Sequence, residues 1–518
     1  MPEVHASQNG TRTNGTAEHA PLVPAKIEPA LSDAAQRAVV RCRDAQRHWA
    51  RQPLEARVDA LVRAAKEMLR RRGEAIELSK REMGKVEVEG LFNEALGPLD
   101  TVTGWARVVR AATSRRHVSL NPISFPRKSA YVDSVPRGVV GIIAPWNFPI
   151  AGLYRSVLPA LMTGNGVVLK PSEYTPKTSG WLLERLAAEL PDGLVQTIEG
   201  DGRAGAALIG AGIDACVFTG SPRTGRIVRV QCAELGIPAS VEMGGKDAAI
   251  VLGDCDLPRT VAGITSWSLG NAGQACGAIE IAYVEKAIAN EFVERLRQTW
   301  TRLTPESVAP MGNARQLDIV AAQVEDARAK GATVVCGGVH RGEARDGLWY
   351  PPTVLDGCDE RMAVMQDETF GPVLAVARIE GAAEGIRRVN RSRYGLGASI
   401  WTRDLARGER LAERLHVGVV NINNHAFTGA IPALPWSGTK DTGFGIANGP
   451  DALATFVRPR VTTVDASELP ELYWMPYDSA LRDLGEIIAD AQIGRILGAW
   501  KLPLLIRKRL KTIRDFFG

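Results

Sequence analysis

The chain has 518 residues, of which 45% are apolar and 23% are charged, and its formal net charge is +5. This length exceeds one typical domain, so we expect two or three compact units of a globular protein. Seven basic residues and one aspartate in residues 493–518 sum to +6, which leaves −1 for the rest and excludes a nucleic-acid-binding body.

The cysteines, the histidines and the lengths of the apolar runs limit which disulfides, metal sites and membrane segments we expect. The seven cysteines are odd in number, scattered and never spaced as CxxC, which indicates a reducing compartment without disulfides or structural zinc. The seven histidines form no cluster with one another or with cysteine, so we predict no metal site. Residues 1–30 are polar and lack an apolar signal core, which predicts a disordered leader. No uninterrupted apolar stretch reaches about 18 residues, so we expect a cytoplasmic protein without a spanning helix.

Helices are expected first, from about residue 31 to 115, because apolar residues recur there at helical spacing. A strand-like stretch over 118–135 follows, and its two prolines favour a hairpin or a sheet edge. From Gly138, short apolar runs alternate with helical stretches such as Ser179–Leu190, which is typical of an α/β fold with parallel strands. The strand candidates are Val139–Ala144, Gly166–Leu169, Ala215–Phe218, Ser240–Glu242, Ala248–Leu252, Ile281–Val284, Thr333–Cys336 and Val373–Arg378.

Two loops that follow predicted strands carry polar side chains next to proline or glycine. Asn147, between Pro145 and Pro149, can donate an amide N–H to an oxyanion, although an isolated asparagine of this kind more often only forms a turn. Phe218-Thr219-Gly220-Ser221 leads from a strand into a helix, whose N-terminus can meet a pyrophosphate. The Gly200–Gly205 match to GxGxxG is weaker, because it does not follow the first strand of the sheet.

Glu242 and Cys276 are the reactive side chains of the central region. Glu242 closes a strand before two glycines and can act as a general base, the alternative being an ion pair with Lys246 or a neighbour. Cys276 ends the segment Gly270-Asn271-Ala272-Gly273-Gln274-Ala275-Cys276 and is a candidate nucleophile, the alternative being an inert buried thiol. Attack at neutral pH requires a thiolate, which a helix N-terminus or a cationic nicotinamide can favour.

Six motifs in this order resemble the aldehyde dehydrogenase superfamily over about residues 35–460. Besides those around Asn147, Ser221, Glu242 and Cys276, they are Lys170-Pro171-Ser172-Glu173 and Glu368-Thr369-Phe370-Gly371-Pro372-Val373. The resemblance implies NAD(P)-dependent oxidation of an aldehyde to the acid. Cys276 forms a thiohemiacetal and then a thioester, Asn147 and the Cys276 N–H stabilise the oxyanion, and Glu242 activates water.

The resemblance also implies the cofactor site. Lys170 and Glu173 hold the adenosine ribose, Ser221 contacts the pyrophosphate, Glu368 binds the nicotinamide ribose, and Phe370 packs near the ring. The carboxylate of Glu173 repels a 2′-phosphate, so NAD is expected, with NADP as the alternative. The full set of expected cofactor contacts is Trp146, Lys170, Ser172, Glu173, Ser221, Gly225, Gly244, Glu368 and Phe370.

The implied fold has three parts and forms a homodimer or homotetramer. A Rossmann-like cofactor domain is expected over 31–117 and 137–243, and an α/β catalytic domain over 244–452. A β oligomerisation arm is expected over 118–136 and 453–466, followed by a C-terminal extension over 467–518. Three positions depart from the family: Ile281 where arginine is common, Ser437 for a glycine, and Gly445-Ile446-Ala447 for Gly-Arg-Glu. These departures indicate a divergent subgroup.

Two features bear on the substrate. Arg155 stands where succinate-semialdehyde dehydrogenases carry an arginine for the substrate carboxylate, although Gly270 occupies the place of their second arginine; a structural role for Arg155 is the alternative. The tail can form a basic amphipathic helix with Ile506, Leu510, Ile513 and Phe517 on one face. That helix suits an anionic membrane surface and hence a peripheral fatty aldehyde dehydrogenase, or it docks on protein. A non-catalytic binding protein with this fold is a further alternative.

Overall fold

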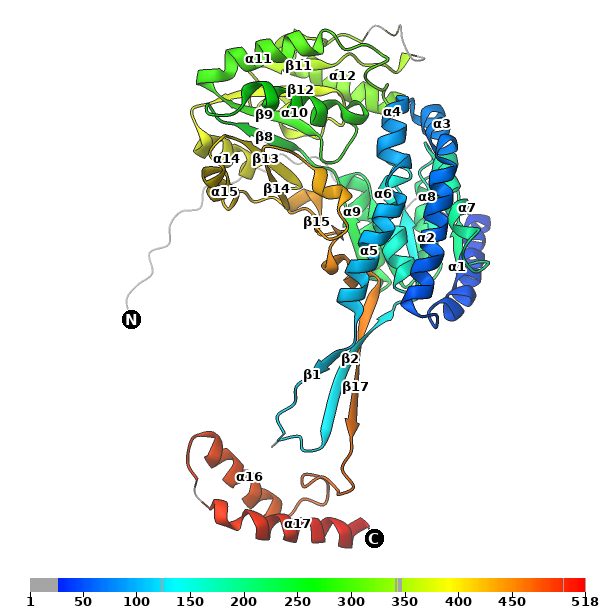
Figure 1. The fold of residues 1–518 in the computed structure, drawn as a ribbon, viewed down its shortest axis with the longest axis vertical. Helices are drawn as coiled ribbons and strands as arrows, with labels where there is room; N and C mark the ends of the chain where they lie inside the picture. Colours follow the sequence, from blue (N-terminus) through cyan, green and yellow to red (C-terminus); the bar gives the residue numbers. More distant parts are fainter. Residues whose placement is uncertain (1–26, 123, 341, 343–346, 497, 518) are drawn as a thin grey trace. The chain divides into compact units, whose positions relative to one another are not determined.

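The computed structural model describes residues 27–122, 124–340, 342, 347–496 and 498–517 (Figure 1). Most of the predicted leader, residues 1–26, lies outside the described residues, and the first helix, α1, begins at Pro29. The chain divides into two compact units. The main unit comprises residues 1–113 and 135–458, and the second unit comprises 114–134 and 459–518.

The main unit contains two sheets, and the first has five parallel strands in the order β5-β4-β3-β6-β7. The strands are β3 (Val139–Ile143), β4 (Gly166–Lys170), β5 (Val195–Thr197), β6 (Ala215–Thr219) and β7 (Ala239–Glu242). The order runs outward from β3 to β5 and then resumes at β6 on the other side of β3. Such a reversal opens a crevice at the carboxyl ends of the two central strands, where α/β proteins bind ligands.

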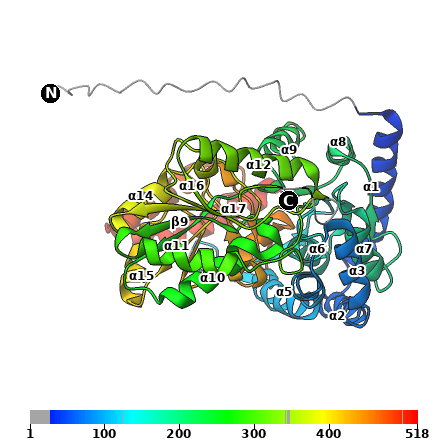
Figure 2. The same ribbon diagram turned by 90° about the horizontal axis from the view of Figure 1, so that it is seen from above.

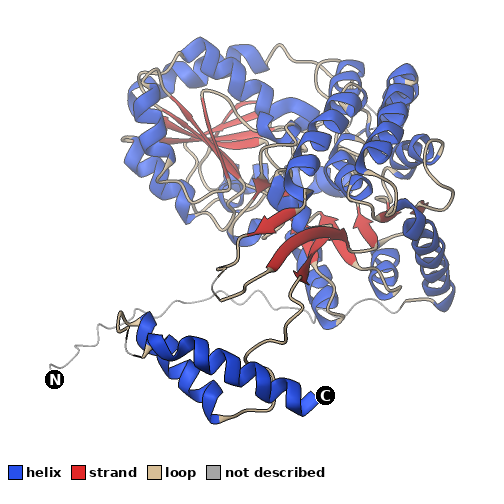
Figure 3. Ribbon diagram, turned by 60° about the horizontal axis from the view of Figure 1, so that its bottom comes forward, coloured by secondary structure: helices blue, strands red, loops and turns tan. Residues whose placement is uncertain are grey.

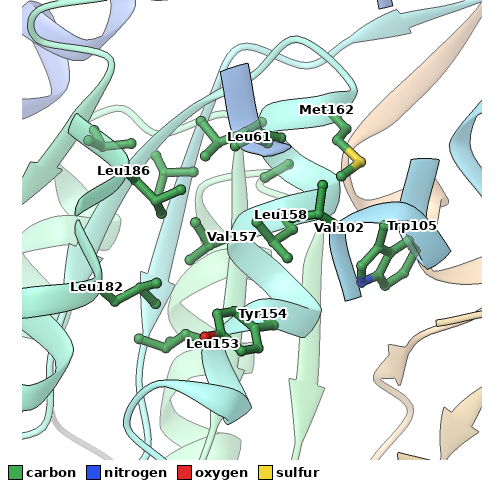
Figure 4. Close-up of a cluster of buried hydrophobic side chains, with 14 of the residues drawn as sticks. Leu61, Val102, Trp105, Leu153, Tyr154, Val157, Leu158, Met162, Leu182 and Leu186 are labelled. Carbon is green, nitrogen blue, oxygen red and sulfur yellow. The ribbon is translucent and has the colours of Figure 1, made fainter. Parts of the chain in front are cut away.

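Helices on both faces bury this sheet. On one face lie α6 (Ala151–Met162) and α7 (Pro176–Ala187), and on the other α1 (Pro29–Trp49), α8 (Gly202–Gly210) and α9 (Pro222–Glu234). Helices α2 (Leu54–Arg70), α3 (Arg72–Met83) and α5 (Pro98–Thr113) pack on α6 or α7 as an outer layer, and the short α4 (Glu87–Glu89) and η1 (Gly90–Ala95) adjoin α3. Helix α6 is buried on most of its length, and it packs against side chains of α2, α5 and α7 (Figure 4). This packing fixes the position of the helix that follows the Asn147 loop.

The second sheet has seven strands in the order β10-β11-β12-β9-β8-β13-β14, of which only β10 is antiparallel (Figure 3). Helices α10 and α11 cover one face, and α12 and α14 cover the other (Figure 2). The strands are β8 (Asp247–Val251), β9 (Ile279–Glu285), β10 (Thr333–Cys336), β11 (Thr353–Asp356), β12 (Val373–Ile379), β13 (Gly397–Trp401) and β14 (Val419–Ile422). The helices are α10 (Leu257–Leu269), η2 (Gly270–Gly273), α11 (Lys286–Trp300), α12 (Ala314–Ala329), α13 (Ala363–Gln366), α14 (Ala382–Arg391) and α15 (Leu405–Ala412).

Short elements complete the main unit, and a third sheet begins the second unit. The short elements are η4 (Phe427–Ala430), β15 (Trp436–Ser437), η5 (Lys440–Thr442), β16 (Ile446–Ala447) and η6 (Pro450–Thr455). The third sheet has the order β1-β2-β17, with β1 (Arg116–Val118), β2 (Lys128–Pro136) and β17 (Val457–Asp465). Helices α16 (Ser479–Gln492), η7 (Ala499–Lys501) and α17 (Leu502–Phe517) follow it. No helix of the described residues is long and apolar enough to cross a membrane.

Candidate active site

Cys276 lies in a turn between α10 and β9 that other side chains hold in place. The consecutive residues Asn271, Ala272 and Gly273, which precede Cys276 in this turn, have φ angles of 54°, 55° and 70°, in the left-handed region. The Gln274 amide donates to Asn271 O at 2.8 Å and accepts from Gly312 N at 2.7 Å. These bonds fix an otherwise irregular loop, so the position of the thiol is set by the backbone on both sides of it.

Asn147 reaches the same loop from the end of β3. Its Nδ2 donates to Gln274 O at 3.0 Å, and Asn271 Nδ2 donates to Asn147 O at 3.1 Å. The side chain is 7% exposed, and its nitrogen makes this one hydrogen bond to the described residues. One N–H of the amide is therefore left for a further acceptor beside the Cys276 loop.

Glu242 ends β7, where the chain also bridges to Gly443. Burial raises the pKa of Glu242 to about 7, and the positive charge of Arg155 opposes that rise. A carboxyl group with a pKa near neutrality suits a general base. The alternative of an ion pair between Glu242 and Lys246 is wrong, because Lys246 Nζ bonds Glu280 Oε2 at 2.5 Å and Thr369 Oγ1 at 2.9 Å.

The environment of Cys276 disfavours the thiolate. Burial raises the pKa of Cys276 to about 12, with Arg155 opposing the rise and Glu242 adding to it. A helix N-terminus does not activate the thiol, since Cys276 follows the C-terminal end of α10 and precedes β9. Attack at neutral pH therefore requires a base or a bound cation.

Arg155, on α6, is the positive charge common to both reactive groups. Its guanidinium lies 5.6 Å from the centroid of the Trp436 ring, and its buried Nη1 has no hydrogen-bond partner among the described residues. The indole N–H of Trp436 is likewise buried and unpartnered within that part of the chain. The same ring packs against the turn next to Cys276, because a Cβ added at Gly277 would lie 2.9 Å from it. Two unused donors thus lie near the thiol.

The predicted cofactor residues near the adenosine end lie at the carboxyl ends of β4 and β6. Lys170 Nζ pairs with Glu173 Oε2 at 2.9 Å, and Ser172 is buried nearby in sequence. Ser221 caps the N-terminus of α9, where its Oγ accepts from Thr224 N at 3.3 Å. A Cβ at Gly225 would lie 2.5 Å from Met243 Sδ. A larger residue at position 225 would therefore clash with Met243, which explains the glycine in the first turn of α9. The exposed helix N-terminus fits a pyrophosphate.

The predicted residues at the nicotinamide end connect the two sheets. The rings of Trp146 and Phe370 meet edge to face at 5.5 Å between centroids. Glu368 Oε1 accepts from Gly245 N at 3.0 Å, and a Cβ at Gly244 would lie 2.1 Å from Glu368 Oε2. Burial raises the pKa of Glu368 to about 8. The segment that carries Glu368 and Phe370 therefore adjoins the backbone after Glu242.

Three groups at this site were not found from the sequence. Asn271 and Trp436 give no pattern that distinguishes them from ordinary loop residues. Glu280 lies inside β9 and accepts from Lys246, Thr369 N and Phe370 N, with the two backbone bonds at 2.9 and 2.8 Å. A glutamate within an apolar strand is the one signal that could have revealed this network, because buried carboxylates need partners.

Comparisons with known proteins find similar chains along most of the sequence. The model of the aldehyde dehydrogenase family matches residues 11–462. The chain is 37% identical to 4,4'-diapolycopene aldehyde oxidase of Methylomonas sp, over 86% of this chain and 84% of that protein. It is 35% identical to 2-aminomuconic 6-semialdehyde dehydrogenase of Pseudomonas sp, over 76% and 82%. The solved structure of Mycobacterium tuberculosis aldehyde dehydrogenase complexed with NAD+ superposes with a TM-score of 0.78 at 29% identity, over 86% of this chain and 92% of that one.

Proposed function

Because the chain belongs to the aldehyde dehydrogenase family, we propose that it oxidises an aldehyde to the carboxylic acid with NAD(P) through a thioester on Cys276. The observation that carries this mechanism is the meeting of three groups at one loop. Asn147 bonds the backbone two residues before Cys276. Glu242, with a pKa of about 7, acts electrostatically on the same thiol.

The first step is attack of the Cys276 sulfur on the aldehyde carbon. Because the thiol is neutral in this environment, its proton passes to Glu242 as the carbon–sulfur bond forms. The free N–H of Asn147 and the Cys276 N–H donate to the resulting oxyanion. When bound, NAD(P)⁺ supplies the acceptor for the hydride that leaves the former aldehyde carbon.

The second step is hydrolysis of the thioester. Glu242, after losing its proton to solvent, takes a proton from water as the water oxygen attacks the acyl carbon. The carbon–sulfur bond then breaks, Glu242 returns the proton to the leaving sulfur, and the acid leaves with the Cys276 thiol restored. Both steps use the same carboxyl group, and a pKa near 7 lets it hold or release a proton at neutral pH.

The cofactor assignment rests on the two ends of the crevice. Lys170, Ser172, Glu173, Ser221 and Gly225 hold the adenosine and pyrophosphate, and Trp146, Gly244, Glu368 and Phe370 hold the nicotinamide ribose and ring. Glu173 favours NAD, because its carboxylate repels a 2′-phosphate. Of the nearby arginines, Arg203 pairs with Asp201 at 3.0 Å and Arg226 with Asp441 at 3.2 Å. Arg223 is exposed and forms no ion pair with a described residue, so NADP stays the alternative.

For the substrate, we propose that Arg155 and Trp436 donate to an acceptor group on the aldehyde. Their unpartnered N–H groups lie near Cys276, and burial of an unsatisfied donor costs about 1 to 3 kcal/mol. A semialdehyde carboxylate meets both donors. A relative acts on 2-aminomuconic 6-semialdehyde, by its name, which agrees with this class.

The experiment that tests the function is NADH formation by the purified protein with succinic semialdehyde or decanal. Cys276→Ser should abolish turnover, and Cys336→Ser, at the other partly exposed cysteine, should retain it. Preference for succinic semialdehyde supports Arg155 as a carboxylate contact, and preference for decanal makes it structural. No turnover of any aldehyde by the wild type, with Cys276 inert to iodoacetamide, would favour a non-catalytic binding protein.

We further propose that the chain assembles as a homodimer or homotetramer through the arm predicted over 118–136 and 453–466. Strand β17 supports this, because it is an edge of the third sheet and exposes Val461 and Val464. The predicted domain boundaries and the cytoplasmic location stay predictions.

A further inference from the structure

The C-terminal helices α16 and α17 pack against each other as a hairpin (Figure 3). Ala480, Leu484 and Ile513 are buried between them. Arg509 is also fully buried, where its Nε donates to Leu472 O at 2.6 Å and its Nη1 lies 3.5 Å from Asp478. The hairpin is therefore a folded element with its own interior.

This interior corrects the surface expected from the sequence. Of the predicted apolar face, Ile513 is 2% exposed and Ile506 and Leu510 are partly buried, whereas Phe517 is 66% exposed. Packing against α16 uses most of that face. Any docking surface must come from the side chains that the hairpin leaves outside.

Four large apolar side chains around the turn of the hairpin are left outside. Ile493, Ile496, Trp500 and Leu504 are exposed to 67%, 82%, 78% and 69%, and we call them the apolar crest. Gly494 and Gly498, both with φ near 78°, turn the backbone between them. Twelve of the twenty-eight exposed large apolar side chains of the described residues lie after Val464, beyond the strand proposed for assembly, so this exposure is concentrated rather than scattered.

Positive charge predominates after residue 490, whereas α16 carries Asp483, Glu486 and Asp490 on the other side of the apolar crest in sequence. Six exposed basic residues lie in the same segment, and none forms an ion pair with a described residue; they are Arg495, Lys501, Arg507, Lys508, Lys511 and Arg514. Asp515 is the only acidic residue after position 490. Lys501 Nζ lies 5.3 Å from the centroid of the Trp500 ring, so charge and aromatic surface are adjacent.

The combination of exposed apolar and basic side chains on the hairpin distinguishes three possible binding partners. A contact between the hairpin and the same hairpin of a second copy would place the basic set against itself, which repels. A nucleic acid would use the charges but leave Ile493, Ile496 and Leu504 in water. An anionic bilayer uses both, because headgroups attract lysine and arginine while tryptophan and aliphatic side chains enter the interface.

We propose that the hairpin docks on an anionic lipid bilayer, with the apolar crest inserted at the interface and the six basic residues against the headgroups. The hairpin then holds the protein at the membrane surface. This docking does not depend on the chemistry at Cys276.

Sedimentation of the full-length protein with vesicles tests the proposal. Phosphatidylcholine vesicles with phosphatidylglycerol should pellet the wild type, and vesicles of phosphatidylcholine alone should not. Raised salt should release it. Arg507→Gln/Lys508→Gln/Lys511→Gln should weaken partitioning by about a hundred-fold, at roughly five-fold per basic residue. Ile496→Ser/Trp500→Ser should also abolish pelleting.

Matched controls lie in the main unit. Leu405→Ser, at a side chain 59% exposed on α15, and Lys66→Gln, on α2, should pellet like the wild type. NADH formation from a water-soluble aldehyde should be equal in all variants. Equal pelleting by both vesicle types, or by the hairpin variants, overturns the proposal. A changed oligomeric mass in those variants, or DNA binding lost only with the basic residues, assigns the surface to the other occupants and overturns it too.

Discussion

At the scale of single residues, burial acts on Cys276 and Glu242 in the same direction but with different consequences. Both pKa values rise, to about 12 and about 7, because the charged forms lose water. For the thiol this keeps the nucleophile protonated until a substrate is present. For the carboxyl it creates a base that changes charge near neutral pH. Arg155 moderates both shifts.

We expect activity to follow the ionisation of Glu242. Below a pH of about 7 the carboxyl is protonated and cannot accept a proton from water, so the steady-state rate should fall as the pH is lowered. In Glu242→Gln, loss of the base should reduce that rate by roughly 10²- to 10⁴-fold. Stopped-flow measurement should still detect slow formation of one equivalent of NADH if hydrolysis is the main step affected. Full turnover in the variant would exclude Glu242 as the base.

The same substitution should stabilise the protein at high pH. The pKa of Glu242 is raised from 4.5 to about 7, so the unfolded chain releases its proton first. Stability is then lost as the pH rises from about 4.5 to 7, by up to about 3 kcal/mol above that window. Glu242→Gln should therefore raise the thermal midpoint at pH 8 and change it little at pH 5. An equal effect at both pH values would contradict the burial argument.

Arg155 should affect substrate choice and pH dependence together. Loss of a charge-assisted hydrogen bond costs about 1.5 to 3 kcal/mol, so Arg155→Met should lower kcat/KM for succinic semialdehyde by roughly 10- to 100-fold. Without the guanidinium the pKa of Glu242 rises further, which moves the acid limb of the profile for decanal to higher pH. If Arg155 makes no contact with the substrate carboxylate, the pH shift should remain, but kcat/KM for succinic semialdehyde should fall no more than kcat/KM for decanal. A loss shared equally by both aldehydes, without the pH shift, would also reject the contact.

At the scale of elements, the Cys276 loop depends on close backbone approach. A Cβ at Gly273 would lie 2.1 Å from Gly371 O, next to Phe370, and Gly273 has a φ of 70°. Gly273→Ala should therefore separate the nucleophile loop from the predicted nicotinamide segment and reduce kcat by at least about 100-fold, as expected for misplacement by 1 Å. Gly270→Ala is the control, because nothing lies within 4 Å of its Cβ and its φ is −54°. Similar activity of the two variants would show that the loop tolerates the shift.

The sequence predicts elements well where local pattern and burial agree. The candidates Thr333–Cys336 and Val139–Ala144 match β10 and β3 to within a residue. Strands β13 and β14 were missed, because short strands of this kind carry a weak periodic signal. The network of Glu280 could not be predicted, since its partners come from segments up to 90 residues apart. Motifs locate reactive residues, but tertiary contacts decide how they are charged.

At the scale of the whole molecule, the third sheet offers a route to assembly. Its order leaves β17 with one unpaired edge, and Val461 on that strand is 65% exposed. Long exposed edges commonly pair with another chain or carry charges that prevent pairing. Arg458, Pro459 and Arg460 oppose pairing at the start of β17, so we predict that the second half of the strand, with Val461 and Val464, pairs with a second copy.

Light scattering during gel filtration should find the wild type at two or four times the chain mass of 55.8 kDa. Val461→Lys places a charge on the edge and should shift the population toward the monomer, while Val40→Lys, at a side chain 54% exposed on α1, should not. The active-site groups Cys276, Glu242 and Asn147 all belong to the main unit, so the dissociated variant should still bind NADH. A wild type that is monomeric at all concentrations would reject assembly through the arm, and an unchanged mass of Val461→Lys would place the contact elsewhere.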